Sequence, residues 1–87
     1  MRLEGSIYKR DSILDLQSVE VSEDAQIPLS KRWDIALLAL CKNMNVPIPI
    51  WLNKNSREFV NFHQTIFTPE QFAEEVHFDI FQVKLLV

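Results

Sequence analysis

Apolar and polar residues alternate with a period of two near both ends of the chain. This alternation predicts two strands at residues 2–9 and 13–21 and a third strand at residues 78–87. It is imperfect in the second run, which indicates either a strand partly covered on both faces or a β-bulge. The polar residues 9–12 contain no Asn-Gly or Asp-Gly pair, so they predict a longer hairpin loop built on a type I turn rather than a two-residue loop.

The middle of the chain changes to a helical period. Ser30 is the expected N-cap, Asn45 is the expected left-handed residue at the C-terminus, and Pro47 prevents the helix from continuing. Between these ends the apolar residues recur at helical spacing and their neighbours are also mostly apolar, which predicts a central and largely buried helix. The stripe consists of Trp33, Leu37, Leu40, Cys41 and Met44.

An extended segment and a short helix are expected next. Residues 46–52 contain two prolines at i, i+2, which suits an edge or covering segment rather than a central strand. Asn55, with Glu58 three residues later, is the expected N-cap of a helix over about 56–63. Residues 64–67 are then expected to be extended.

The residues around Thr68 predict the start of a further helix. Thr68 is the expected N-cap, with Pro69 at N1 and Gln71 at N3, which is the arrangement of a capping box. We therefore expect a third helix over about 69–76.

This order of elements predicts one α+β domain spanning residues 1–87. Its sheet is expected to be small, antiparallel or mixed, with about three strands, two N-terminal and one C-terminal, covered on one face by about three helices. The open edges of such a sheet favour strand pairing between copies of the chain.

Composition excludes several classes of protein. The chain has one glycine, so the glycine-rich loops that cradle phosphates are absent, and one cysteine, so no intramolecular disulfide is formed. The N-terminus lacks the apolar stretch of a secretory signal, and no apolar run approaches the roughly 20 residues of a membrane span. These features indicate a cytoplasmic protein without a membrane anchor.

Charge and titratable residues give little support to catalysis or to nucleic-acid binding. The net charge is −3, and the basic residues of the middle third are few and separated. His63 and His77 are scattered and match no metal-ligand spacing, and Cys41 lies within the apolar helix, so no metal or other cofactor is expected. A small enzyme or ligand carrier that uses His63 or His77 is one alternative function. A nucleic-acid-associated accessory protein is another, using a patch of Trp51, Lys54, Arg57, Phe62 and His63.

The leading hypothesis is a non-enzymatic protein–protein interaction or assembly domain, expected to form a homodimer. Aromatic and apolar residues make up a large share of a chain that is too small to bury all of them, since 47% of its residues are hydrophobic. The candidate interaction residues are Pro47, Pro49, Trp51, Phe62 and His63.

Several segments of the second half carry a resemblance. They are Pro47–Leu52, Asn55–Phe59, Phe67–Phe72 and Phe78–Phe81. In these segments the chain resembles short uncharacterised bacterial proteins, chiefly of Gram-positive anaerobes. The resemblance covers about half of the chain and implies a bacterial, cytoplasmic setting, but it brings no activity and no site residue with it.

Overall fold

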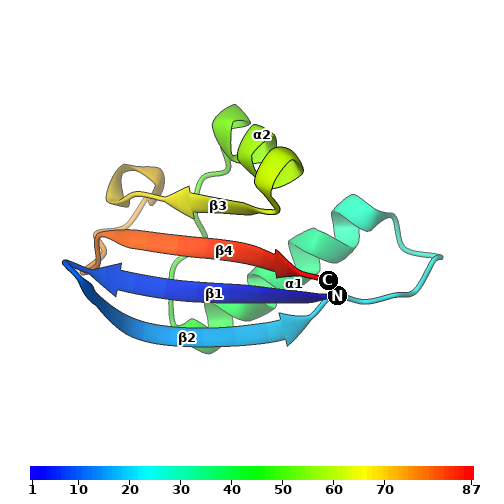
Figure 1. Cartoon of the computed structure of the whole chain (residues 1–87), viewed down its shortest axis with the longest axis horizontal. Helices are drawn as coiled ribbons and strands as arrows, with labels where there is room; N and C mark the ends of the chain where they lie inside the picture. The colour runs from blue at the N-terminus through cyan, green and yellow to red at the C-terminus, as the bar shows by residue number, and fades with distance from the viewer.

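The computed structural model describes residues 1–87, which form one antiparallel sheet and the helices that cover it (Figure 1). The strands lie side by side in the order β2-β1-β4-β3. The α+β class is therefore confirmed, but four strands and two α-helices replace the three and three that were expected. The elements are β1 (Arg2–Lys9), β2 (Ser12–Glu20), α1 (Leu29–Met44), α2 (Asn53–Phe62), β3 (Gln64–Phe67), the 3-10 turn η1 (Pro69–Gln71) and β4 (Ile80–Leu86).

The two faces of the sheet differ in what covers them. α1 packs on β1 and β2, and α2 packs beside β3 on the same face (Figure 1). The core lies on this face, where the side chains of Leu40, Phe67 and Phe81 have no exposed surface. The opposite face of the sheet has no helix on it.

The β1–β2 hairpin corrects one expectation and confirms another. Lys9 pairs with Ser12, so the connection has two residues and not the longer type I loop that was expected. Arg10 adopts a positive φ of 56°, and its N–H donates a hydrogen bond of 2.6 Å to the Asp79 carboxylate. The sequence near the turn could not show this, because the acceptor comes from the other end of the chain. The register shift opposite Ile7 and Tyr8 is the β-bulge that the imperfect alternation of β2 indicated.

The ends of the two α-helices also differ from the sequence prediction. α1 begins two residues early, with Pro28 as N-cap, so Ser30 lies within the first turn instead of capping it. Asn45 ends α1 in the left-handed conformation, as expected. α2 begins with Leu52 as N-cap, and Asn55 occupies N3, from which its side-chain oxygen accepts a hydrogen bond of 2.9 Å from the Leu52 N–H.

The prediction of a third helix is wrong beyond the first turn of that helix. Pro69–Gln71 forms only the 3-10 turn η1, and Phe72 is already extended at φ −118° and ψ 137°. The Gln71 side chain accepts from the Thr68 N–H, as a capping box requires, but its amide nitrogen donates to the Ile50 carbonyl and to the Asn55 side chain. These contacts, which come from elsewhere in the fold, hold Gln71 buried, and Phe72 turns into the core.

β3 is the fourth strand that the sequence analysis described only as an extended segment. It pairs with β4 along its whole length, with Thr65 opposite Val83 and Phe67 opposite Phe81. Residues 46–52 form no strand, and the Ile50 N–H donates to the Gln71 carbonyl at 2.6 Å, which agrees with a covering segment. No helix has the length and apolar character needed to cross a membrane.

Candidate functional site

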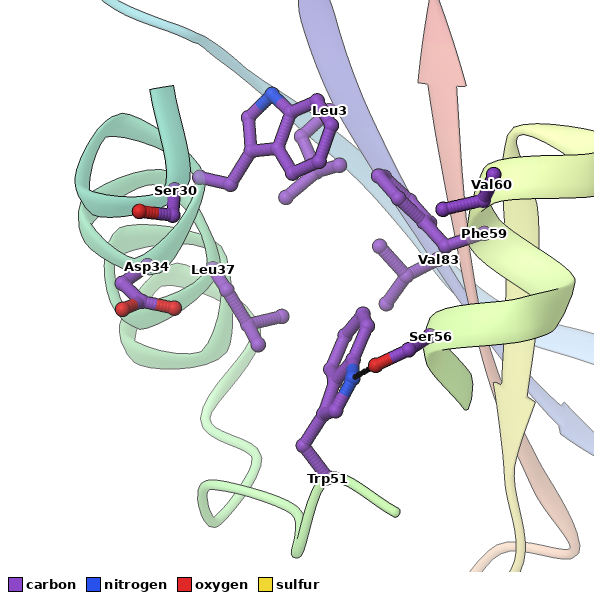
Figure 2. A pocket seen from close by; sticks show the side chains of 10 residues that line it. Leu3, Ser30, Asp34, Leu37, Trp51, Ser56, Phe59, Val60 and Val83 are labelled. Atoms are coloured by element: carbon purple, nitrogen blue, oxygen red, sulfur yellow. Dashed lines mark hydrogen bonds between the residues drawn. The ribbon is translucent and has the colours of Figure 1, made fainter. Parts of the chain in front are cut away.

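A pocket of about 240 Å³ opens between α1 and α2, above the sheet (Figure 2). Its floor comes from Leu3 of β1 and Val83 of β4, and seven of its ten lining residues are hydrophobic. Figure 2 shows Asp34 and Leu37 projecting from α1 on one side, with Ser56, Phe59 and Val60 on α2 facing them. Trp33 and Ser30 complete the α1 side, and Trp51 closes the space between the two helices.

Trp51 is held as a fixed wall of this pocket. Its indole N–H donates a hydrogen bond of 2.8 Å to the Ser56 hydroxyl, which is visible in Figure 2. The ring contacts Phe59 edge-on, with centroids 5.9 Å apart, and Phe67 at 5.6 Å. The side chain nevertheless keeps 41% of its surface exposed. A large aromatic surface is therefore presented to the pocket in a single orientation.

Trp33 and Asp34 give the α1 wall its chemistry. Trp33 packs perpendicular to Phe59, with ring centroids 5.1 Å apart, and its indole nitrogen is buried without a hydrogen-bond partner. The ring of Trp33, and not its N–H group, is thus what lines the pocket. Asp34 is exposed at the rim, and its carboxylate has neither an ion pair nor a hydrogen bond. It is the one ionisable side chain among the lining residues.

The remaining candidate interaction residues do not share this pocket. Pro49 is buried and Pro47 half-buried, so both serve the covering segment. Phe62 is 69% exposed and lines a separate hollow of about 220 Å³ beside β3. Because Trp51 and Phe62 belong to different hollows, they do not form the single stacking platform that the nucleic-acid alternative requires.

The two histidines are exposed and lie apart from both hollows. His63 ends α2 with a positive φ of 57°, its backbone N–H donates to the Phe59 carbonyl, and its own carbonyl accepts from the Leu85 N–H at 2.7 Å. This backbone role explains its position at the end of the helix. Neither imidazole lines either hollow or forms a hydrogen bond or ion pair with a carboxylate, which is the arrangement that an acid–base site needs.

Cys41 is a core residue, and burial raises the pKa of its thiol to about 11 from the usual value near 9. Below pH 9 the thiol is protonated in the folded and unfolded chains alike, so it has no effect on how the free energy of unfolding depends on pH. Between pH 9 and about 11 the unfolded chain releases this proton while the folded chain retains it. We therefore expect this contribution to the free energy of unfolding to fall by about 2–3 kcal/mol over that range.

Chemical denaturation of the wild type and of Cys41→Ala, at steps between pH 8 and pH 11, measures this contribution. The difference between the two pH profiles isolates the contribution of the thiol from that of the rest of the chain. Parallel profiles would contradict the assignment.

The uncovered face of the sheet is the second candidate surface, and the sequence analysis did not single it out. The half nearest the β1–β2 turn carries most of the apolar side chains, and Ser6 and Gln82 lie between them. We call its apolar and aromatic residues the open half-face: Tyr8, Ile13, Leu16, Ile66 and Ile80. Ile13 and Leu16 are 49% and 53% exposed, and Leu14 at the bulge is 55% exposed. The alternation of residues in β1 and β4 indicates which side chains share this face. The bulge in β2 shifts the alternation of that strand by one residue, so the sequence of β2 does not show that Ile13 and Leu16 lie on the same face.

Comparison with protein-family models, with curated proteins and with solved structures gave no match. The fold, the pocket and the open half-face are therefore the observations on which a function can be argued.

Proposed function

We propose that the chain is a non-enzymatic interaction domain that forms a homodimer through the uncovered face of its sheet. The observation that carries this proposal is the open half-face, where the large aliphatic side chains of Ile13 and Leu16 in β2 stay about half exposed. An antiparallel sheet with one face toward water normally presents polar side chains there. An apolar face with polar surroundings is instead typical of an interaction surface.

The charges of the same face favour a second copy as the partner. Arg2 forms an ion pair with Glu20, and Glu4 lies directly opposite Lys84 in the register of β1 and β4. The face therefore carries two positive and two negative side chains and is neutral, although the chain has a net charge of −3. Two copies can approach through this face with little of the repulsion that other surfaces of an acidic protein would cause.

The size of the face favours stacking of the two sheets over edge pairing. Strands about 4.8 Å apart, rising about 3.4 Å per residue, give a four-stranded face of roughly 20 by 27 Å. A stable interface buries about 800 Å² of accessible surface on each partner, which is more than the roughly 540 Å² of flat area, so the whole face has to be used. Face-to-face stacking at about 10 Å uses the whole face, so that it covers both the open half-face and the charged end of the sheet.

Leu16→Glu is the test of this interface. The substitution places a charge on the open half-face of both copies, and we expect the dissociation constant of the dimer to rise at least about 30-fold, or about 2 kcal/mol. Sedimentation velocity over a range of protein concentrations measures it. Leu38→Glu is the matched control, because Leu38 is 48% exposed on α1 and should leave the dimer unchanged.

Two results would contradict the proposal. One is a wild-type chain that stays monomeric at high concentration. The other is a dimer that survives Leu16→Glu but dissociates in Trp51→Ala, which would place the interface at the pocket instead.

A further inference from the structure

The pocket between α1 and α2 combines aromatic walls with a single, unpartnered carboxylate. We propose that it binds a small organic cation, namely an ammonium group joined to an apolar or aromatic body. This site is separate from the open half-face, so the inference does not depend on the dimer.

The aromatic walls present ring surface to the pocket, and neither indole N–H is available to a ligand. The Trp51 indole nitrogen is already bonded to Ser56, and the Trp33 nitrogen is buried. Phe59 stands at 74° to both indoles, so the three rings line the pocket from different directions. The negative face of an aromatic ring attracts a cation, and this attraction is strongest for tryptophan. A ligand that required hydrogen bonds from these rings would find none.

Asp34 sets the sign of the charge that the pocket accepts. Its carboxylate lies at the rim on the α1 side, opposite α2, without a basic partner (Figure 2). The other lining residues are seven hydrophobic side chains and the hydroxyls of Ser30 and Ser56, of which the latter already accepts from Trp51. No positive group lines the pocket to neutralise Asp34, so an anion is disfavoured there and a cation is favoured.

The volume limits the size of the cation. An apolar cavity of about 150 Å³ accommodates benzene. The larger volume of about 240 Å³ suits a body of about ten non-hydrogen atoms by the same scale. A benzyl group carrying a trimethylammonium head is close to this size, and the pocket is open at its rim. Its ring would lie on the apolar floor of Leu3 and Val83, with the head between the indoles and Asp34.

Three probes of similar shape and different charge test the inference: benzyltrimethylammonium, the neutral benzyl methyl sulfone and the anionic phenylmethanesulfonate. Titrations followed by NMR, using the two indole N–H signals, give the affinity of each. We expect the cation to bind more tightly than the sulfone, and the sulfonate to bind least. Added salt should weaken the cation more than the sulfone, since only the cation uses the charge of Asp34.

Two variants separate the charge from the rings. Asp34→Asn should weaken the cation about fivefold and leave the sulfone unchanged, because the carboxylate is at an exposed rim. Asp11→Asn is the matched control. Asp11 is exposed in the β1–β2 turn, does not line the pocket, and makes no hydrogen bond or ion pair. Trp51→Leu keeps an apolar wall and should weaken the cation more than the sulfone.

The inference is overturned if none of the three probes shifts the indole signals, if the sulfone or the sulfonate binds as tightly as the cation, or if Asp34→Asn leaves the affinity for the cation unchanged. A folded Asp34→Asn protein, shown by an unchanged spectrum outside the pocket, makes the last result decisive.

Discussion

Asn55→Ala is expected to lower the free energy of unfolding by about 4 kcal/mol, the largest single effect anticipated for this chain. Asn55 has no exposed surface. Its side-chain oxygen accepts from the Leu52 N–H and from the Gln71 amide, while its nitrogen donates to the Thr65 hydroxyl and the Ile66 carbonyl. One amide therefore connects the start of α2, strand β3 and the turn η1.

Removing this amide takes hydrogen bonds from two buried residues and from two partly buried backbone groups. The Gln71 amide and the Thr65 hydroxyl, in residues only 4% and 2% exposed, each lose one of two partners. The Leu52 N–H and the Ile66 carbonyl lose their side-chain partners at partly buried positions. Each buried polar group left unsatisfied costs about 1–3 kcal/mol, and alanine adds a cavity of its own. Because folded domains are stable by only about 5–15 kcal/mol, the substitution removes a large part of the total.

Urea denaturation of Asn55→Ala and of Asn53→Ala measures the effect. Asn53 is exposed in the first turn of the same helix and makes no side-chain hydrogen bond, so its substitution should change stability by less than about 0.5 kcal/mol. Equal midpoints for the two variants would show that the network contributes little. A fall in stability with an unchanged m-value would place the effect in the folded state.

This network also explains why part of the fold was predictable and part was not. The alternation of residues 2–9 and the apolar stripe of α1 are properties of short stretches, and the corresponding elements form close to where they were expected. The expectation of a largely buried α1 was wrong, because the helix buries one face on the sheet and leaves Ile35 and Leu38 on the other side 47% and 48% exposed. The fate of residues 69–76 depends instead on Gln71, whose amide is used by Ile50 and Asn55 from elsewhere in the chain. Local capping signals predicted a helix there, and these distant partners reduced it to one turn.

The candidate surfaces show the same division. Trp51 could be selected from sequence because a large aromatic residue beside two prolines is conspicuous, and it does line the α1–α2 pocket. The sequence around Asp34 did not single this residue out. Its relation to the two indoles depends on how α1 and α2 are spaced above the sheet, and no residue spacing within either helix contains that information.

The chain's single glycine leads to the second large effect. Gly5 lies on the face of β1 beneath α1, and a Cβ atom added there would lie 2.7 Å from the Met44 sulfur, 2.9 Å from a Leu40 methyl carbon and 3.1 Å from the Phe81 ring. The first two separations are shorter than carbon atoms tolerate, so α1 or its side chains must move. Overpacking of this kind in a close-packed core costs about 1–3 kcal/mol, and we expect Gly5→Val to reach the upper end, about 3 kcal/mol, with Gly5→Ala between it and the wild type.

Strand propensity predicts the opposite sign for Gly5→Val, which makes the substitution informative. Valine favours a strand over glycine by up to about 1 kcal/mol, so an uncrowded position would gain stability. Thermal unfolding of Gly5→Val, Met44→Ala and the double variant decides between the two effects. If the close approach of α1 is what requires glycine, shortening Met44 makes room for the new side chain, and the double variant loses less stability than the sum of the single variants. Additive losses, or a Gly5→Val chain at least as stable as the wild type, would show that the close approach of α1 to β1 does not require glycine at position 5.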